Sequence, residues 1–281
     1  MLPSTFQRGP ISGTGIGLRA LHYQEIIATR PNIPWFEVLT DNYMSPGGLP
    51  LYYLEKIREH YPIVMHSVGL SIGSTDPLDM DYLKGLKKLK DRFQPAWISE
   101  HLCWTSVHGK HFHDLMPLPY TPEVVAHVAE RIRQVQDFMG ERLVIENVSS
   151  YLNYKDSQMT EWEFVTQVAE TADCDILCDI NNIHISATNH SFDANQYIHA
   201  IPAKRVRQFH LAGFEDKGDY LLDSHSRPVS EEVWQLYRQA LRRFGPVPTL
   251  IEWDADIPPL KTLLDEAHKA DQEMRLIHAA A

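Results

Sequence analysis

The chain has 281 residues and a formal net charge of −11. This acidic balance gives no general attraction to a nucleic-acid backbone, and no apolar run approaches the roughly 20 residues that a membrane helix needs. Residues 1–13 lack the basic and apolar regions of a signal peptide, so we expect a cytoplasmic protein with neither a nucleic-acid nor a membrane partner.

Strand-like and helix-like segments alternate along the chain. Short apolar runs predict eight strands, near residues 13–18, 34–39, 62–67, 96–101, 142–147, 175–180, 206–211 and 248–253. Helical spacing appears between them, at residues 20–30, 51–61, 80–93, 122–139, 160–172 and 230–245. No Gly-, Ser- or Pro-rich linker divides the chain, so we expect one domain over residues 1–281.

Several segments carry local signals for their structure. The GTGIG run of the first strand lacks the spacing of a dinucleotide fingerprint, so it predicts close packing rather than a phosphate site. Pro122 suits a first helical position, Thr160 with Glu163 forms a capping-box pattern, and Ser230 leads the last of these helices. Three cysteines are too few for a disulfide framework, and Cys174 and Cys178 are expected in the core.

Regular alternation of strands and helices predicts parallel strands joined by right-handed crossovers. A count of eight strands favours a single closed (β/α)8 barrel, the TIM barrel, over an open sheet. In such barrels the functional residues lie at the carboxyl ends of the strands. We therefore expect the polar residues at these ends to converge at one mouth of the barrel.

The apolar runs repeatedly end in His, Asp or Glu. A charge buried in such a run costs several kcal/mol unless it is paired or bound to a metal. Eight candidates with nitrogen or oxygen ligands suffice for two or three ions of iron, zinc or manganese, and no cysteines converge with them to suggest a thiolate site. These candidates are His66, Glu100, Glu146, Asp179, His210, Asp223, His225 and Glu252, with Asp223 and His225 in the loop after the seventh strand.

Glu37, Glu100 and His101 leave alternatives open. Glu37 fits a site role or a barrel-interior ion pair with a residue such as Arg19. His101 adjoins Glu100, and strand alternation lets only one of the two point inward, so we favour Glu100 as the ligand.

Other polar residues near the strand ends each have two possible roles. Asn147 and Asn182 are ligands through their amide oxygens or hydrogen-bond donors that orient ligands. His184 is a ligand or a loop residue. A His-rich loop after the fourth strand, with His108, His111 and His113, is expected to be a surface loop whose place over the mouth leaves a substrate role open.

An ordered set of motifs resembles the multinuclear non-heme iron-dependent oxidative enzymes, the family of the methanobactin-biosynthesis catalytic subunit and the 3-thiaglutamate pathway enzyme. The motifs span nearly the whole chain: GIGLR, FEVLTDNY, HSVGLSIG, SEHLCW, DLMPLPYT, IENVSSY, CDINNIHISATNH, FHLAG, DSHSRPVSEEVWQLY and LIEWD. The resemblance implies an iron- and O2-dependent oxidase that modifies cysteines of a ribosomally made precursor peptide. A separate partner protein would present this peptide.

The resemblance also implies a cofactor and its ligands. Two or three irons, of mixed Fe(II) and Fe(III) state, would lie at the mouth of the barrel. The eight candidates above become iron ligands by position, with Asn147, Asn182 and His184 as further ones, and turnover is expected to depend on Asp223 and His225. The product would be an oxazolone–thioamide, a thiooxazole-type ring or a peptide that has lost a carbon fragment. The sequence leaves open whether the protein forms a homo-oligomer.

The order of acidic residues and histidines also resembles the trinuclear-zinc apurinic endonucleases and the xylose-isomerase-like barrels. In the endonuclease pattern a His follows the Asp of the sixth strand by three positions, where this chain has Asn182. A zinc-dependent phosphodiesterase is therefore the alternative function. A metal-dependent sugar isomerase is a lesser one, because no catalytic Lys or His–Asp pair is evident at the mouth.

Overall fold

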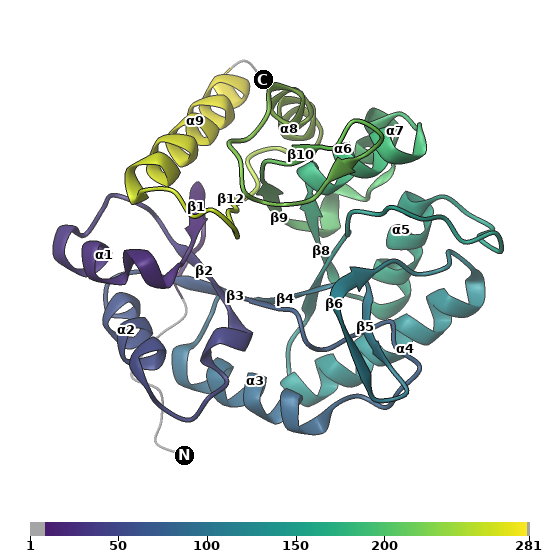
Figure 1. The fold of residues 1–281 in the computed structure, drawn as a ribbon, viewed down its shortest axis with the longest axis horizontal. Helices are drawn as coiled ribbons and strands as arrows, with labels where there is room; N and C mark the ends of the chain where they lie inside the picture. The colour runs from purple at the N-terminus through teal and green to yellow at the C-terminus, as the bar shows by residue number, and fades with distance from the viewer. Residues whose placement is uncertain (1–8, 280–281) are drawn as a thin grey trace.

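Eight parallel strands close into a barrel that a ring of helices surrounds (Figure 1). The computed structural model describes residues 9–279. The prediction that residues 1–13 are not a signal peptide rests partly on residues 1–8, which lie outside the described part. Around the barrel the order is β1-β12-β9-β8-β7-β4-β3-β2. The strands are β1 (Thr14–Gly17), β2 (Phe36–Leu39), β3 (Ile63–Ser67), β4 (Ile98–His101), β7 (Leu143–Glu146), β8 (Asp175–Asp179), β9 (Val206–Leu211) and β12 (Thr249–Ile251).

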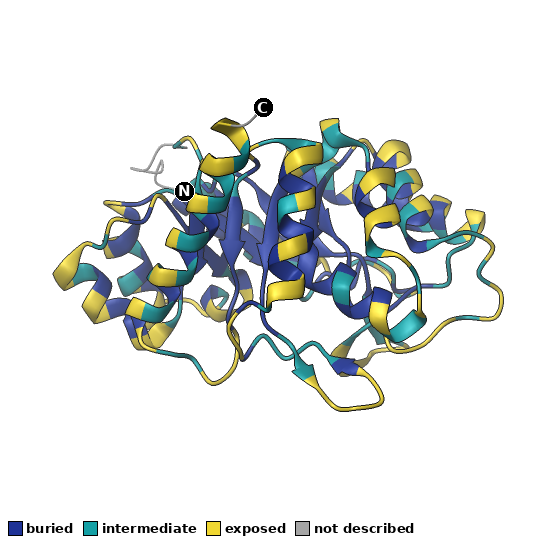
Figure 2. Cartoon of the chain, turned by 90° about the horizontal axis from the view of Figure 1, so that it is seen from above, coloured by how far each residue is buried: buried dark blue, intermediate teal, exposed yellow. Residues whose placement is uncertain are grey.

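The helices cover the outside of the barrel, with their exposed residues pointing outward and the strands buried between them (Figure 2). The longer helices are α1 (Tyr23–Thr29), α2 (Leu49–Arg58), α3 (Met80–Phe93), α4 (Pro122–Met139), α5 (Glu161–Ala172), α6 (Ile180–His190), α7 (Ala194–Ala200), α8 (Glu231–Phe244) and α9 (Leu260–Ala279). Short 3-10 turns are η1 (Ala20–His22), η2 (Thr40–Tyr43) and η3 (Ala203–Arg205). None of the helices in the described part of the chain is long and apolar enough to cross a membrane.

The helix starts follow the expected capping signals. Thr160 and Glu163 form the capping box at the start of α5, where the Thr160 hydroxyl accepts from the Glu163 N–H and the Glu163 carboxylate accepts from the Thr160 N–H. The Ser230 hydroxyl accepts from the Val233 N–H at the start of α8. Each such cap satisfies a backbone donor that the helix leaves free, which is typically worth about 1 kcal/mol.

The barrel interior changes character along its axis. Six inward side chains fill one layer: Trp35, Val64, Trp97, Val144, Leu177 and Leu250. Gly15 faces this layer, and a Cβ there would lie 2.5 Å from the Trp35 ring, so the first strand needs glycine for packing as expected. Because side chains alternate along a strand, the inward positions that follow this layer toward the carboxyl ends include Glu37, His66 and Glu146. The apolar layer thus supports a polar one.

Two β-hairpins follow the carboxyl ends of barrel strands, one after β4 and one after β9. One, β5 (Trp104–Val107) with β6 (Lys110–Met116), contains the His-rich segment that was expected to be a loop. His108 and Gly109 form its turn with positive φ, and the Asp76 carboxylate accepts from both of their N–H groups at 2.9 Å. The second hairpin pairs β10 (Glu215–Asp216) with β11 (Leu221–Leu222).

The three cysteines are buried with free thiols, and Cys174 and Cys178 lie in the core as expected. Burial is the main reason that the pKa of the Cys178 thiol is raised above its ordinary value. These thiols are therefore packing groups rather than reactive ones.

Glu161, the first residue of α5, supports a prediction about stability. Its buried carboxyl accepts from the Tyr197 hydroxyl at 2.9 Å, and burial raises its pKa from 4.5 to about 7. Protonation therefore favours the folded state, so the stability from this group is complete below pH 4.5 and is lost as the pH rises through 7. We expect the free energy of unfolding of the wild type to fall by about 3 kcal/mol over this range relative to Glu161→Gln, measured by urea denaturation. Parallel pH profiles for the two proteins would contradict this prediction.

Candidate metal centre

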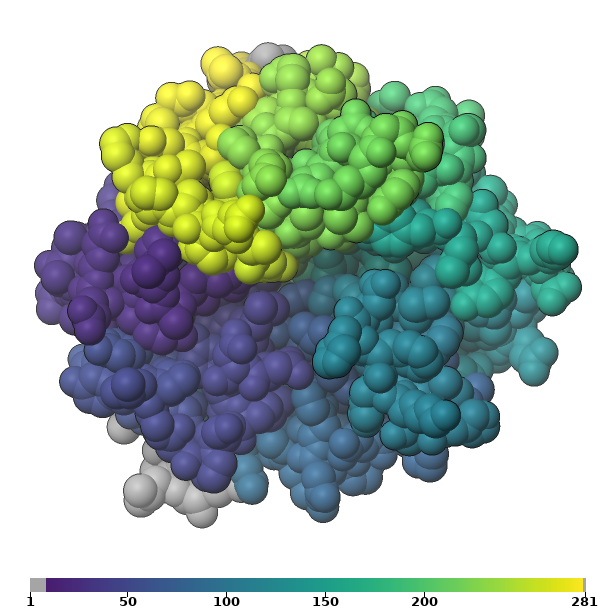
Figure 3. Space-filling view, in the orientation of Figure 1, coloured from purple at the N-terminus to yellow at the C-terminus, as the bar shows by residue number. Residues whose placement is uncertain are grey.

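Inward-facing His, Asp and Glu side chains gather in the hollow at the centre of the face shown in Figure 3. They form three groups whose possible ligand atoms lie within 4.8 Å of one another. Group one is His66, His101 and Glu146; group two is Glu146, Asp179, His210 and Glu252; group three is His225, Glu252 and Asp254. Glu146 and Glu252 each belong to two groups, so each carboxylate links neighbouring groups of possible ligand atoms.

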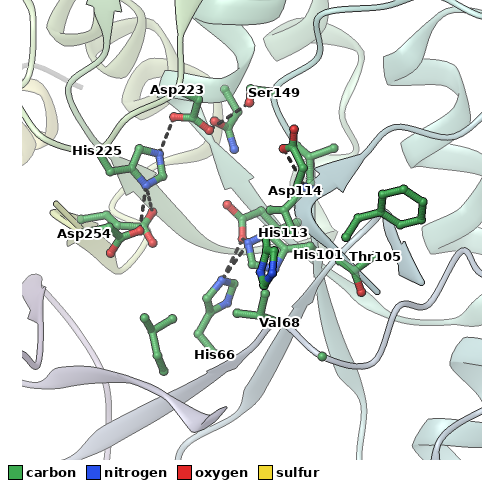
Figure 4. Close-up of a pocket in the computed structure, with 18 of the residues that line it drawn as sticks. His66, Val68, His101, Thr105, His113, Asp114, Ser149, Asp223, His225 and Asp254 are labelled. Atoms are coloured by element: carbon green, nitrogen blue, oxygen red, sulfur yellow. Dashed lines mark hydrogen bonds and ion pairs between the residues drawn. The ribbon is translucent and has the colours of Figure 1, made fainter. Parts of the chain in front are cut away.

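Group one brings two imidazoles to one carboxylate oxygen. The Nε2 atoms of His66 and His101 lie 3.3 and 3.4 Å from Glu146 Oε2 and 3.2 Å from each other (Figure 4). His66 Nδ1 contacts the Ser99 hydroxyl at 2.7 Å, which orients the opposite nitrogen toward the group. Such convergence of two ring nitrogens on one oxygen suits a shared cation.

Group two surrounds His210 Nδ1 with carboxylates. This nitrogen lies 2.9 Å from Glu252 Oε2, 3.6 Å from Glu146 Oε1 and 3.9 Å from Asp179 Oδ2. Asp179 also caps α6, because its Oδ1 accepts from the Asn182 N–H at 2.6 Å. The cap fixes the carboxylate and leaves Oδ2 directed at the group.

Group three lies nearer the solvent and includes Asp254, which the sequence analysis did not single out. His225 Nδ1 lies 3.2 Å from Asp254 Oδ2 and 3.5 Å from Glu252 Oε2. The other ring nitrogen, Nε2, lies 2.7 Å from Asp223 Oδ1 (Figure 4). Asp223 and His225 are thus adjacent as expected, but Asp223 lies beyond the His225 ring, where the Ser149 hydroxyl donates to it.

The donor set fits metal cations. Among the described residues, the buried atoms of this region without a hydrogen-bond partner include Glu146 Oε2, Asp179 Oδ2, Asn182 Oδ1, His210 Nδ1, His225 Nε2 and Glu252 Oε2. Buried polar atoms without partners are costly, and a cation bound among them would satisfy them together. Nitrogen and carboxylate ligands without thiolates suit iron, zinc or manganese.

The pKa values of the site residues reflect the same accumulation of buried charge. Burial is the main cause that raises the pKa of Glu146 to about 7 and that of Asp179 well above its ordinary value. Burial also disfavours the charged form of His101, but the carboxylates of Glu146 and Glu100 outweigh it and raise its pKa to about 9. A bound cation would favour ionised carboxylates and neutral imidazoles.

The structure differs from the expected choice of Glu100 over His101. Trp97 and Ser99 face the barrel interior, and alternation along β4 therefore turns His101 inward and Glu100 outward. The Glu100 carboxylate accepts from the Ser67 hydroxyl and the Leu70 N–H, both at 3.0 Å, and from the His101 N–H at 2.8 Å. It ties the end of β3 to β4 and lies in none of the three groups.

Helix α6 starts directly after β8 and places two further candidates, Asn182 and His184, on different sides. Asn182, in its first turn, lines the pocket, whereas His184 is two residues further on, about 200° around the helix, and packs against Phe214 outside the pocket lining. The Asn147 amide exchanges hydrogen bonds with the backbone of Asp179, as its oxygen accepts at 2.9 Å and its nitrogen donates at 3.0 Å. Asn147 therefore holds β7 to β8.

The pocket above the groups has a volume of about 560 Å³. The β5–β6 hairpin contributes His111, Phe112, His113 and Asp114 to its lining, while His108 lies outside that lining. Among the described residues that line this pocket, none is Lys or Arg. A polyanionic ligand such as a nucleic-acid backbone would find no Lys or Arg side chain there.

Comparison with known proteins is consistent with this architecture. A sequence profile of the family described as "RiPP precursor modification enzyme MbnB/TglH/ChrH" matches residues 13–275. Over 261 residues the chain is 54% identical to a UPF0276 protein of Acaryochloris marina, covering 93% of this chain and 94% of that protein.

Two solved structures share the fold at low sequence identity. A xylose isomerase domain protein from Alicyclobacillus acidocaldarius is 13% identical with a TM-score of 0.60, covering 95% of this chain and 98% of that chain. Endonuclease IV from Thermus thermophilus is 15% identical with a TM-score of 0.59, covering 97% and 100%. These likenesses confirm the predicted xylose-isomerase-like barrel and show the fold alone.

The orientation of β4 leads to a prediction that separates His101 from Glu100. We expect His101→Ala to remove about one bound cation from protein loaded with Zn²⁺, because group one loses a ligand. Glu100→Gln should keep the metal but lower the free energy of unfolding by about 1–3 kcal/mol, because the new amide faces backbone and hydroxyl donors. Metal analysis and urea denaturation measure the two effects. Metal loss in Glu100→Gln with full retention in His101→Ala would reverse the assignment.

Arg19 leads to a prediction about group three. Its guanidinium forms an ion pair with Asp254 and donates to the Trp253 carbonyl at 2.9 Å, so it competes with a cation for this carboxylate. Because a partly exposed pair is worth up to about 1 kcal/mol, Arg19→Gln should bind the weakest equivalent of Zn²⁺ about fivefold more tightly. Isothermal titration calorimetry measures this, and Arg92→Gln, which alters an exposed ion pair with Glu55 on α2, is the control. Unchanged or weaker binding in Arg19→Gln would exclude the competition.

Proposed function

The chain belongs to the MbnB/TglH/ChrH family of RiPP precursor modification enzymes, which act on ribosomally synthesised and post-translationally modified peptides, and on that premise we propose a specific activity. The protein oxidises cysteine residues of such a precursor peptide, using iron and dioxygen. The product is an oxazolone–thioamide, a thiooxazole-type ring or a peptide from which a carbon fragment has been excised.

The observation that carries this proposal is the sharing of Glu146 and Glu252 between neighbouring groups of ligand atoms. A single cation would need three or four ligands, whereas the three groups offer more and are linked by these two carboxylates. We propose His66, His101, Glu146, Asp179, His210, His225, Glu252 and Asp254 as the ligands, with Asn182 and Asp223 beside them. Two or three irons fit this arrangement.

When bound, iron would supply an open coordination position for a cysteine thiolate and also the electrons that reduce dioxygen. The residues of the chain orient the ligands and exclude water. Ser99 and the Asp179 cap fix the orientation of His66 and of the Asp179 carboxylate, so the ligands need no rearrangement. The buried apolar layer beneath, which includes Trp97 and Leu250, excludes water from the inner side of the site.

The pocket suits a peptide better than a phosphodiester. Its volume of about 560 Å³ is within the usual range for small-ligand sites, enough for a cysteine with its neighbouring backbone. Phe112 and Tyr151 give its lining apolar surface, and its uncoordinated charges are acidic, as in Asp114. A zinc-dependent phosphodiesterase acting on a nucleic acid would instead be expected to use Lys or Arg side chains for the phosphate backbone, and the described lining lacks both.

The test uses iron-loaded protein, prepared without oxygen, and a cysteine-containing precursor peptide encoded beside its gene. We expect that dioxygen and a reductant will change the peptide mass at cysteine, and that the neighbouring gene product, as the presenting partner, will increase the yield. Mass spectrometry with fragmentation locates the change. Equal turnover with zinc alone, or an inert peptide together with cleavage of abasic DNA, would overturn the proposal in favour of hydrolysis.

The variants Asp223→Ala and His225→Ala should abolish this turnover, because His225 joins group three and Asp223 holds its ring. We expect unchanged circular dichroism, since the barrel layers beneath do not include these residues. His199→Ala, on the exposed face of α7, is the matched control and should keep full activity. Full turnover in both site variants would remove them from the reaction.

A further inference from the structure

A chain of buried hydrogen bonds crosses the barrel interior from the apolar layer to His210. The Trp97 indole N–H donates to Gln208 Oε1 at 2.7 Å, and Gln208 Nε2 donates to Glu37 Oε2 at 2.6 Å. His210 Nε2 lies 3.2 Å from the same oxygen of Glu37. These hydrogen bonds thus join β9 and β2 to Trp97, the residue just before β4, and all four side chains are at least nine-tenths buried.

Trp97 determines which way the Gln208 amide faces. An indole N–H can only donate, so it holds the Gln208 carbonyl oxygen on its own side and leaves the NH2 group for Glu37. With the amide reversed, the Gln208 NH2 group would meet the Trp97 N–H and its oxygen would meet Glu37. Two repulsive contacts therefore disfavour the reversed orientation. The expected partner of Glu37, Arg19, pairs with Asp254 instead.

The hydrogen-bond chain bears on which nitrogen of His210 carries a proton. Nδ1 faces group two and must be unprotonated to bind a cation there, which leaves the ring proton on Nε2. Glu37 accepts that proton at Nε2. In the competing form the proton is on Nδ1, which lies 2.9 Å from Glu252 Oε2, while Nε2 accepts from Gln208 Nε2 at 2.9 Å.

We propose that Glu37 is a positioning residue that selects the metal-binding tautomer of His210 against the Gln208 NH2 group, which lies 2.9 Å from Nε2 and favours the other tautomer. Its carboxylate gains a second donor only when Nε2 is protonated, and a buried carboxylate is stabilised by each donor it accepts. The inference rests on the proposed role of His210 as a ligand. It does not depend on the identity of the metal or on the reaction.

The test compares three substitutions. Glu37→Leu removes the acceptor and the charge, whereas Glu37→Gln removes the charge but offers an amide oxygen in the same place. Trp97→Phe keeps an aromatic ring in the apolar layer but frees the Gln208 amide to reverse. Glu161→Leu, which removes another buried carboxylate, and Trp104→Phe, which removes an indole donor to the Pro117 carbonyl, are the matched controls.

Two measurements are made, both without peptide, iron or dioxygen. Competition with a chelator gives the affinity for Co²⁺. Long-range ¹H–¹⁵N correlation spectra of Zn²⁺-loaded protein, labelled at histidine and assigned with His210→Gln, show which ring nitrogen is protonated. Their outcome is independent of the peptide assay, so failure of the proposed oxidation would leave this test intact.

We expect the wild-type spectrum to show His210 protonated at Nε2 and metal-bound at Nδ1. Glu37→Leu should weaken Co²⁺ binding by about 10- to 100-fold and shift the Nε2–H signal, as losses of groups behind metal ligands do. Glu37→Gln should restore most of the affinity, and both controls should match the wild type. Trp97→Phe should bind Co²⁺ at least as tightly as the wild type, because a reversed Gln208 amide no longer directs an N–H at His210 Nε2.

Three results would overturn the inference. Metal bound through Nε2 of His210 would exclude it directly. Equal weakening in Glu37→Gln and Glu37→Leu would show that only the charge of Glu37 matters. If Glu37→Leu does not fold, Glu37→Asp decides, because its shorter side chain draws the carboxylate back from Nε2, and unchanged Co²⁺ affinity with an unchanged Nε2–H signal there would show that Glu37 has no influence.

Discussion

The structure depends on how buried charge is accommodated at the mouth of the barrel. Glu146, Asp179, His210 and Glu252 are nearly or fully buried, and each has a ligand atom without a hydrogen-bond partner. Burying carboxylates in this way costs several kcal/mol unless a cation compensates. These four residues form group two, so a cation there would contact ligand atoms of all four, and Glu146 and Glu252 link this group to the other two. The demand for positive charge at the mouth is therefore set by the positions of the strand ends.

Strand alternation places these charges, and it explains how much could be predicted from sequence. All eight strands and the caps at Thr160 and Ser230 follow from local patterns that act over a few residues. The parallel barrel then brings the strand ends together, so His66 and Glu252 could be assigned to one mouth although 186 positions of sequence separate them. An inward-pointing residue at a strand end has few places to lie other than the site.

The choices that sequence did not determine are those of side-chain direction and of loop path. Glu100 and His101 are equally polar neighbours, and only the inward direction of Trp97 and Ser99 in the same strand decides between them. Asp254 has the same direction as Glu252 two positions earlier, a signal that alternation past the strand end would have provided. The β5–β6 hairpin turns at His108 and Gly109, whose N–H groups donate to the distant Asp76 carboxylate, and a two-residue turn with Gly was the local signal that could have indicated it.

The two layers of the barrel interior divide stability from chemistry. The apolar layer around Trp97 and Leu250 and the buried faces of the helices hold the barrel closed without help from the site. The polar layer can then hold groups that oppose one another until cations bind. The layers are connected where the Trp97 indole reaches Gln208 and, through it, Glu37. A packing residue thereby fixes the Gln208 amide, which contacts both Glu37 and His210, so the rigid core determines hydrogen bonds at the candidate site as well as supporting it from beneath.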